Sequence, residues 1–165
     1  MARRLTDFSS GIPFGTAQDL STAGNHGTLN NGVSFGSGVA VQAFAFDGVD
    51  DLVNVPHSSA INFDFNNAFS FSLWFKTATT LESYLFIKGN SESLQPSYAV
   101  VFRGDTGGGV DVLLRDGSSG TLTNAVGSGW NDNQWHHLVV TYDGSSTAAG
   151  ILATTFKIAD ADFMG

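Results

Sequence analysis

The chain has 165 residues, of which 42% are hydrophobic and only 13% charged, and this length fits one domain able to bury its own core. Its formal net charge of −8 repels phosphate backbones, so the composition argues against nucleic-acid binding. The absence of cysteine excludes disulfides, thiolate catalysis and zinc ribbons. No signal peptide and no apolar run long enough to cross a bilayer is visible, so we expect no membrane insertion.

Alternation of apolar and polar residues, the pattern of half-buried strands, runs along most of the chain. It is clearest in residues 69–76, where apolar residues alternate with Ser70, Ser72, Trp74 and Lys76. The same pattern predicts strands at 41–46, 52–55, 84–88, 98–103, 110–115, 134–142 and 155–158.

Short strands separated by turns rich in Gly and Asp are typical of all-β proteins. We therefore predict a two-sheet antiparallel β-sandwich of the jelly-roll type. No repeat or linker divides the chain, so we expect a single domain over residues 1–165, with residues 1–14 as an irregular N-terminal arm. Because Trp74 and Trp135 belong to strands, we assign both to the core.

Two adjacent histidines, His136 and His137, suggest a metal site at first sight. Successive side chains of a strand point to opposite faces, so these two cannot bind one ion together. The other histidines, His26 and His57, fall in distant loops, whereas a zinc site normally needs three converging protein ligands. We interpret His137 as a strand histidine that is hydrogen-bonded to a neighbour.

Four stretches resemble laminin-G-like domains of the concanavalin A-like lectin/glucanase superfamily. They are N-H-G-T-L-N-N-G-V-S-F (25–35), A-F-A-F-D-G-V-D-D-L-V-N-V-P (43–56), F-S-F-S-L-W-F-K (69–76) and W-H-H-L-V-V-T-Y-D-G (135–144). Their joint order is that of the family, and the resemblance implies a jelly roll. Only 21 residues follow Gly144, so the resemblance also implies a sandwich that is incomplete at its C-terminal end.

An incomplete sandwich would expose unpaired strand edges, which proteins normally cover or pair. We therefore expect neighbouring subunits in an assembly, with contacts concentrated in residues 1–14 and 151–165.

The superfamily also contains glycoside hydrolases, which need two carboxyl groups held a short distance apart. On a strand, that requires acids at alternate positions of one face. The only glutamates are Glu82 and Glu92, and neither begins the E-x-D-x-x-E motif of these hydrolases. No G-x-S-x-G nucleophile motif is present either. We predict that the protein is not an enzyme.

Exposed aromatic side chains bind sugar rings by stacking, and Trp130 is the best candidate because it lies among polar turn residues. We predict a ligand-binding site formed by Trp130, Asn131 and Asn133. The alternative is that Trp130 folds over one end of the sandwich as a lid.

Calcium is the one cofactor that the sequence suggests. Residues 156–165 resemble the calcium-binding segment of pentraxins, which implies a site formed by Asn90, Glu92, Asp160 and Asp162. The densest acidic cluster is instead Asp47, Asp50 and Asp51, and such a loop supplies the oxygen ligands that calcium prefers. For this loop we favour a structural interpretation, in which Asp47 and Asp50 accept backbone N–H groups of the turn.

These features predict a non-catalytic surface recognition or adhesion module that binds glycan or protein, located extracellularly or on a virion surface. The alternative is a structural subunit of a larger assembly, such as a phage decoration or fibre protein or an extracellular filament.

Overall fold

The computed structural model describes residues 16–39, 42–63, 66–89, 97–115, 121–147 and 150–157. The chain divides into two compact units, Met1–Ile61 (unit 1) and Asn62–Gly165 (unit 2). All strand pairs in the described ranges are antiparallel, and none of the helices there is long and apolar enough to cross a membrane. The predicted all-β fold is confirmed. The expected single domain with an arm at residues 1–14, which lie outside the described residues, stays a prediction.

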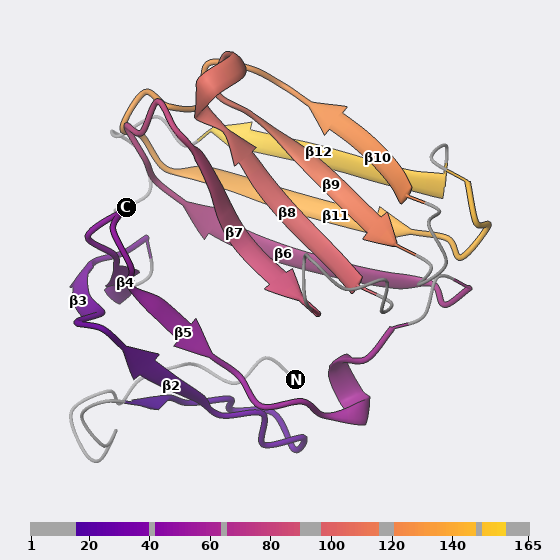
Figure 1. The fold of residues 1–165 in the computed structure, drawn as a ribbon, viewed down its shortest axis with the longest axis horizontal. Coiled ribbons are helices and arrows are strands. Elements are labelled where there is room, and N and C mark those ends of the chain that lie inside the picture. Colours follow the sequence, from indigo (N-terminus) through magenta and orange to yellow (C-terminus); the bar gives the residue numbers. More distant parts are fainter. Residues whose placement is uncertain are drawn as a thin grey trace, which may run out of the picture. The chain divides into compact units, whose positions relative to one another are not determined.

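Unit 1 consists of short strands joined by tight turns (Figure 1). A three-stranded sheet has the order β1–β2–β5, and a separate hairpin pairs β3 with β4. The bounds are Thr16–Ala17 for β1, Gly27–Asn30 for β2, Ser34–Ser37 for β3, Gln42–Ala45 for β4 and Leu52–Asn54 for β5, followed by a 3-10 turn, η1, at Ser59–Ile61. Asn31 and Gly32 connect β2 to β3 with positive φ angles of 61° and 114°, which Asn and Gly adopt more readily than other residues.

Unit 2 is a sandwich of two antiparallel sheets (Figure 1). The four-stranded sheet has the order β10–β9–β8–β7, and the three-stranded sheet has the order β12–β11–β6. The bounds are Phe69–Phe75 for β6, Glu82–Lys88 for β7, Ser97–Arg103 for β8, Gly109–Arg115 for β9, Thr121–Val126 for β10, His136–Tyr142 for β11 and Ile151–Lys157 for β12; a 3-10 turn, η2, spans Gly104–Thr106.

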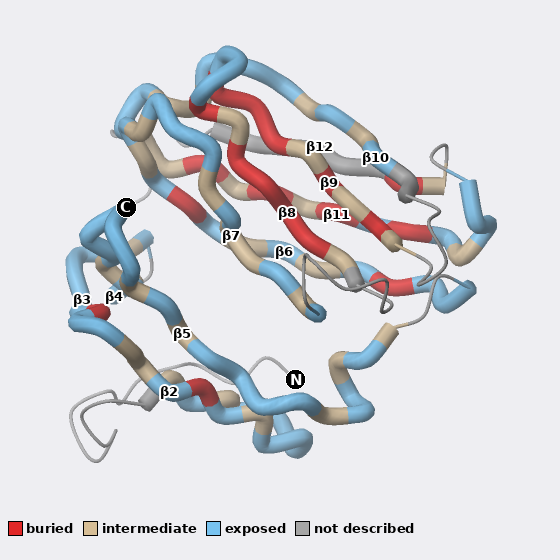
Figure 2. The backbone as a smooth tube through the Cα atoms, viewed as in Figure 1, coloured by how far each residue is buried: buried red, intermediate tan, exposed pale blue. Residues whose placement is uncertain are grey.

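The core of unit 2 lies between its two sheets, along the inward faces of β8, β9 and β11 (Figure 2). Val100 and Phe102 come from one sheet and Leu138 and Val140 from the other, and all four are fully buried. Burying a side chain of this kind stabilises a fold by about 1.5–3 kcal/mol. A hydrogen bond of 2.6 Å from Asn124 Nδ2 to the carbonyl oxygen of Ile151 links β10 with β12 across the sheets.

The strands predicted from alternation agree with the structure except in a few places. Strands β1, β2, β3 and β10 were not predicted from alternation, and the last predicted strand, 155–158, begins earlier, as β12 at Ile151. The expected alternation of β6 is confirmed, with Phe69 and Phe75 buried. The assignment of Trp74 to the core is wrong: its side chain is 38% exposed, because the opposite face of β6 faces the second sheet. Trp135 is half-buried.

Candidate functional site

Residues 127–133 form a loop between β10 and β11 at one end of unit 2, and we call it the Trp130 loop. Three backbone bonds fix it: Gly129 N–H to Gly107 O at 2.7 Å, Trp130 N–H to Gly108 O at 2.8 Å, and Asn133 N–H to Thr77 O at 2.9 Å. The loop is therefore tied to two neighbouring loops through its own backbone, and this leaves its side chains available for other contacts.

Trp130 itself is half-buried at the end of the core. Its ring centroid is 6.3 Å from that of Phe75, in an edge-on arrangement, and 6.0 Å from that of His136. The indole also lies against Gly127, where an added Cβ would overlap the ring. This packing favours the lid interpretation, and a role of Trp130 in ligand binding stays a prediction.

The two predicted asparagines lie beside Trp130 in the same loop. Asn131 is half-buried and packs against Gly108, where an added Cβ would come within 2.6 Å of Asn131 Oδ1. Asn133 is exposed and has a positive φ of 60°. The structure thus brings all three predicted ligand-binding residues together in one loop.

The histidine pair divides between the two faces of β11. His136 is buried, its Nε2 lies 2.9 Å from Asp132 Oδ1, and its ring stacks on that of Phe75. His137 lies on the opposite face, where its ring stacks on the indole of Trp74 with a centroid separation of 4.5 Å. The prediction that the two histidines face opposite ways is confirmed.

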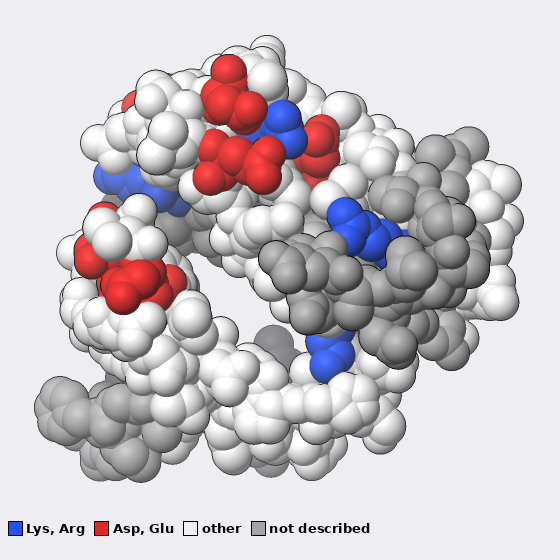
Figure 3. All heavy atoms as spheres, viewed as in Figure 1, with Lys and Arg blue, Asp and Glu red and all other residues white. Residues whose placement is uncertain are grey.

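Arg103, at the end of β8, lies among three carboxylates, and Figure 3 shows acidic side chains gathered around a basic one on this face. The Arg103 guanidinium lies 2.6 Å from Glu82, 3.2 Å from Asp105 and 3.9 Å from Asp111. The three carboxylates therefore share one cation.

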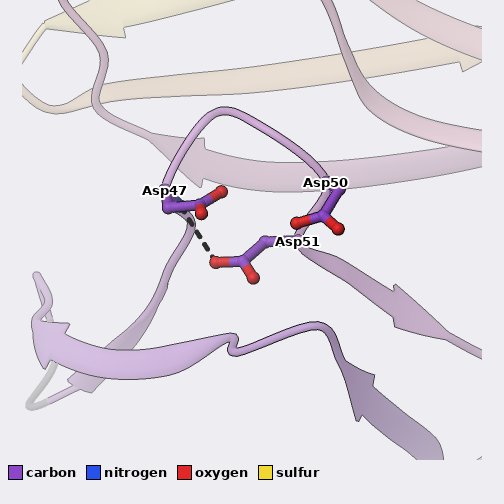
Figure 4. Close-up of side chains that lie close together, drawn as sticks. All are labelled: Asp47, Asp50 and Asp51. Carbon is purple, nitrogen blue, oxygen red and sulfur yellow. Dashed lines mark hydrogen bonds between the residues drawn. The ribbon is translucent and has the colours of Figure 1, made fainter.

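Three acidic residues of unit 1 form a tight cluster in the turn between β4 and β5 (Figure 4). One carboxylate oxygen from each of Asp47, Asp50 and Asp51 can be chosen so that all three lie within 4.8 Å of one another. The turn rests on the connection between β2 and β3, where Asn31 Nδ2 donates to the Asp50 carbonyl oxygen at 2.8 Å.

The structural interpretation of this turn is confirmed for one of its two residues. Asp47 Oδ1 accepts the Val49 N–H at 2.8 Å, as expected. The second carboxylate that accepts a backbone N–H belongs to Asp51 rather than Asp50: its Oδ2 accepts the Asp47 N–H at 2.9 Å. Asp51, the residue that precedes β5, therefore closes the turn, because its carboxylate accepts the N–H of Asp47.

The other oxygen of Asp51, Oδ1, is buried and has no hydrogen-bond partner among the described residues. A buried carboxylate oxygen without a partner is unfavourable unless a cation compensates it. Two oxygens on one calcium ion are at most about 5 Å apart, since each lies 2.3–2.6 Å from the metal. The three aspartates therefore fit a calcium ion. The predicted set of Asn90, Glu92, Asp160 and Asp162 lies outside the described residues.

The sandwich of unit 2 places the chain among antiparallel β-sandwich proteins. A laminin-G-type family model, described as the concanavalin A-like lectin/glucanases superfamily, matches residues 47–152. The match covers well over half of the chain, which therefore belongs to this superfamily, as its sequence motifs predicted. Comparison with curated proteins and comparison with solved structures found no match.

Membership narrows the range of functions without selecting a ligand. Laminin-G-like domains generally bind carbohydrate or protein, are generally non-catalytic and are typically extracellular, and members of the superfamily often bind metal ions. The fold by itself does not identify the partner, which depends on the side chains of the site.

Proposed function

We propose that this chain is a non-catalytic recognition or adhesion module that binds glycan or protein through the Trp130 loop. The observation that carries the proposal is the fixed backbone of this loop, in which Asn131 and the exposed Asn133 follow Trp130 by one and three residues. Polar groups held in place before binding lose less entropy when a ligand arrives. An apolar ring flanked by hydrogen-bonding groups is also the usual composition of a ligand site.

The arrangement of acids supports a non-catalytic role. Both known geometries of glycoside hydrolysis use two carboxyl groups on either side of the scissile bond. In the described part of unit 2, Glu82, Asp105 and Asp111 all lie against Arg103, which pairs with their charge. The Trp130 loop contributes one acid, Asp132, which is bonded to His136.

A glycan array, followed by titration calorimetry with any ligand found, tests the proposal. Asn133→Gly is the sharpest variant, because glycine keeps the positive φ of this position and removes only the carboxamide. We expect this variant and Asn131→Ala each to weaken binding about fivefold to tenfold, the usual effect of losing a hydrogen bond. Asn54→Ala, which removes an exposed carboxamide from unit 1, is the control. Binding that both loop variants leave unchanged would refute the proposal.

We further propose that Asp47, Asp50 and Asp51 hold a calcium ion. Support comes from the partnerless oxygen of Asp51 and from the frequent binding of metal ions in this superfamily. The ion would compensate the three negative charges and stiffen the turn between β4 and β5. The pentraxin-like set of Asn90, Glu92, Asp160 and Asp162 is the alternative calcium site.

A structural subunit of a larger assembly, such as a virion decoration or fibre protein, is the second candidate function. Unit 1 favours it, because Phe35, Phe44 and Phe46 form an aromatic row and are 45%, 41% and 54% exposed. Exposed apolar patches of this kind mark interaction surfaces. Contacts would also involve residues 151–165, of which Ile151–Lys157 form the edge strand β12, and residues 1–14.

Sedimentation equilibrium of the whole chain tests the assembly. We expect an oligomer at micromolar concentration that Phe44→Ser shifts towards monomer, with Tyr84→Ser, at another exposed aromatic, as the control. A stable monomer would refute this candidate. The proposed extracellular or virion location predicts that antibodies against the chain label intact cells or particles, and labelling only after lysis would contradict it.

A further inference from the structure

The outer face of the three-stranded sheet in unit 2 carries a stacked pair of rings, Trp74 on β6 and His137 on β11. Their centroids are 4.5 Å apart and their planes differ by 17°. The two residues are directly opposite in the register of β6 and β11, which explains why their rings meet. Trp74 remains 38% exposed, although a large aromatic side chain gains more stability in the core.

The position of β6 determines which side of the indole is accessible. Within the described chain, β6 is the edge strand of its sheet and pairs with β11 alone. His137 therefore covers the indole face that is turned towards β11. The other indole face is turned away from β11, on the side where β6 is the last strand of the described sheet, and the stack with His137 holds the plane of the indole in place.

A lysine follows Trp74 in the sequence. Lys76 is exposed and follows Trp74 by two residues, a spacing that places both on the same side of an extended chain. Within the described ranges Lys76 makes no ion pair, whereas Arg103 faces three carboxylates. An uncompensated cation beside an exposed ring is notable in a chain whose formal net charge is −8.

We propose that Trp74, His137 and Lys76 form a binding site for an acidic saccharide, namely a pyranose that carries a carboxylate. The C–H face of the sugar ring stacks on the open face of the indole. The ammonium group of Lys76 pairs with the sugar carboxylate, and this charge selects acidic over neutral sugars. His137 is a positioning residue that keeps the indole upright at the sheet edge. This site lies on the outer face of β6 and β11 and shares no residue with the Trp130 loop. An experiment can therefore reject one site and leave the other standing.

Calorimetric titration of the full chain with tetragalacturonate, and with neutral tetragalactose as the matched probe, tests the site. We expect binding of the acidic probe, at least tenfold weaker binding of the neutral one, and an affinity for the acid that falls as salt is added. Trp74→Ser and Lys76→Gln should each weaken acid binding about tenfold, and Trp74→Phe, which keeps a planar ring, should weaken it less. Tyr84→Ser controls for the loss of an exposed aromatic ring elsewhere, and Lys88→Gln controls for the loss of one positive charge elsewhere. Circular dichroism checks that each variant is folded.

Several results would overturn the inference. Absence of tetragalacturonate binding would do so, as would equal affinity for both probes or affinity that Lys76→Gln leaves unchanged. Acid binding that is lost in Asn133→Gly and kept in Trp74→Ser would assign the acidic sugar to the Trp130 loop instead. The proposed function would then stand while this site would be rejected.

Discussion

The imidazole of His136, only 2% exposed, lies with its Nε2 2.9 Å from Oδ1 of Asp132. The same carboxylate oxygen accepts the Gln134 N–H at 3.0 Å, so Asp132 anchors the Trp130 loop to β11. Asp132→Ala should lower the free energy of unfolding by about 1–3 kcal/mol, because it leaves a buried polar group without its partner. Urea unfolding measures this change.

Asp132→Asn serves as the matched comparison, since its amide keeps an oxygen at this position. Asp132→Asn should lower the free energy of unfolding less than Asp132→Ala does. Asp105→Ala, at an exposed position of η2, should lower it by less than about 0.5 kcal/mol. If Asp132→Ala were as stable as the parent chain, the hydrogen bond between Asp132 and His136 would contribute nothing to the free energy of unfolding.

The indole of Trp130 packs directly against Gly127 and leaves no room for a side chain there. Gly127→Ala would place a methyl group inside the ring of Trp130 and would also strain a backbone with φ of 70°. Gly129→Ala separates the two effects, because Gly129 has a similar φ of 74° but no atom within 4 Å of the added carbon. We expect Gly127→Ala to be the more destabilising by about 1–3 kcal/mol, the usual cost of overpacking.

Near-ultraviolet circular dichroism and tryptophan fluorescence should report a displaced Trp130 in Gly127→Ala and an unchanged environment in Gly129→Ala. Identical spectra and stabilities for the two variants would contradict the lid packing.

Calcium should raise the melting temperature of the chain in a concentration-dependent way. A ligand that binds only the folded state stabilises it by about 2.7 kcal/mol at a concentration one hundred times its dissociation constant. Asp51→Asn should abolish the shift, because this residue supplies the partnerless oxygen.

The variants Asp160→Asn and Asp162→Asn distinguish the two candidate calcium sites. They should leave the shift intact if the ion is held by the Asp47, Asp50 and Asp51 turn, and remove it if the pentraxin-like set holds the ion. Melting curves that are the same in chelator and in millimolar calcium would exclude both sites.

Asp143 should titrate at a pH below the ordinary range of an aspartate. Hydrogen bonds from the hydroxyl and the backbone N–H of Ser145 hold the pKa of Asp143 below its ordinary value. The ionised carboxylate of Asp143 stabilises the folded state because its pKa is lower there than in the unfolded state. This stabilisation is fully present above the unfolded-state pKa and is lost as the pH falls through the folded-state pKa.

Carboxyl-carbon NMR titration measures this pKa directly. Ser145→Ala should move it back towards the ordinary value, whereas Ser72→Ala, on β6, should leave it unchanged. A titration midpoint that Ser145→Ala does not move would show that the hydroxyl has no such effect.

The strands and their faces were largely predictable from the alternation of apolar and polar residues, because successive side chains of a strand point to opposite faces. It placed Phe69 and Phe75 on one side of β6, and His136 and His137 on opposite sides of β11, as the structure shows. Strand β10 escaped prediction because its sequence, T-L-T-N-A-V, is mostly polar or small and carries little periodic signal. Its position follows from pairing with β9 rather than from its own residues.

By itself, the sequence determined the all-β class, the family and the grouping of residues into faces, since these depend on local periodicity and on motif order. The tertiary structure decided which face of β6 is covered, and so left Trp74 exposed beside His137. It also decided that Asp51 closes the acidic turn and that Trp130 lies on Gly127. Contacts of this kind depend on how the chain brings one turn or strand against another, and neither spacing nor composition encodes the distance between two side chains that meet in space.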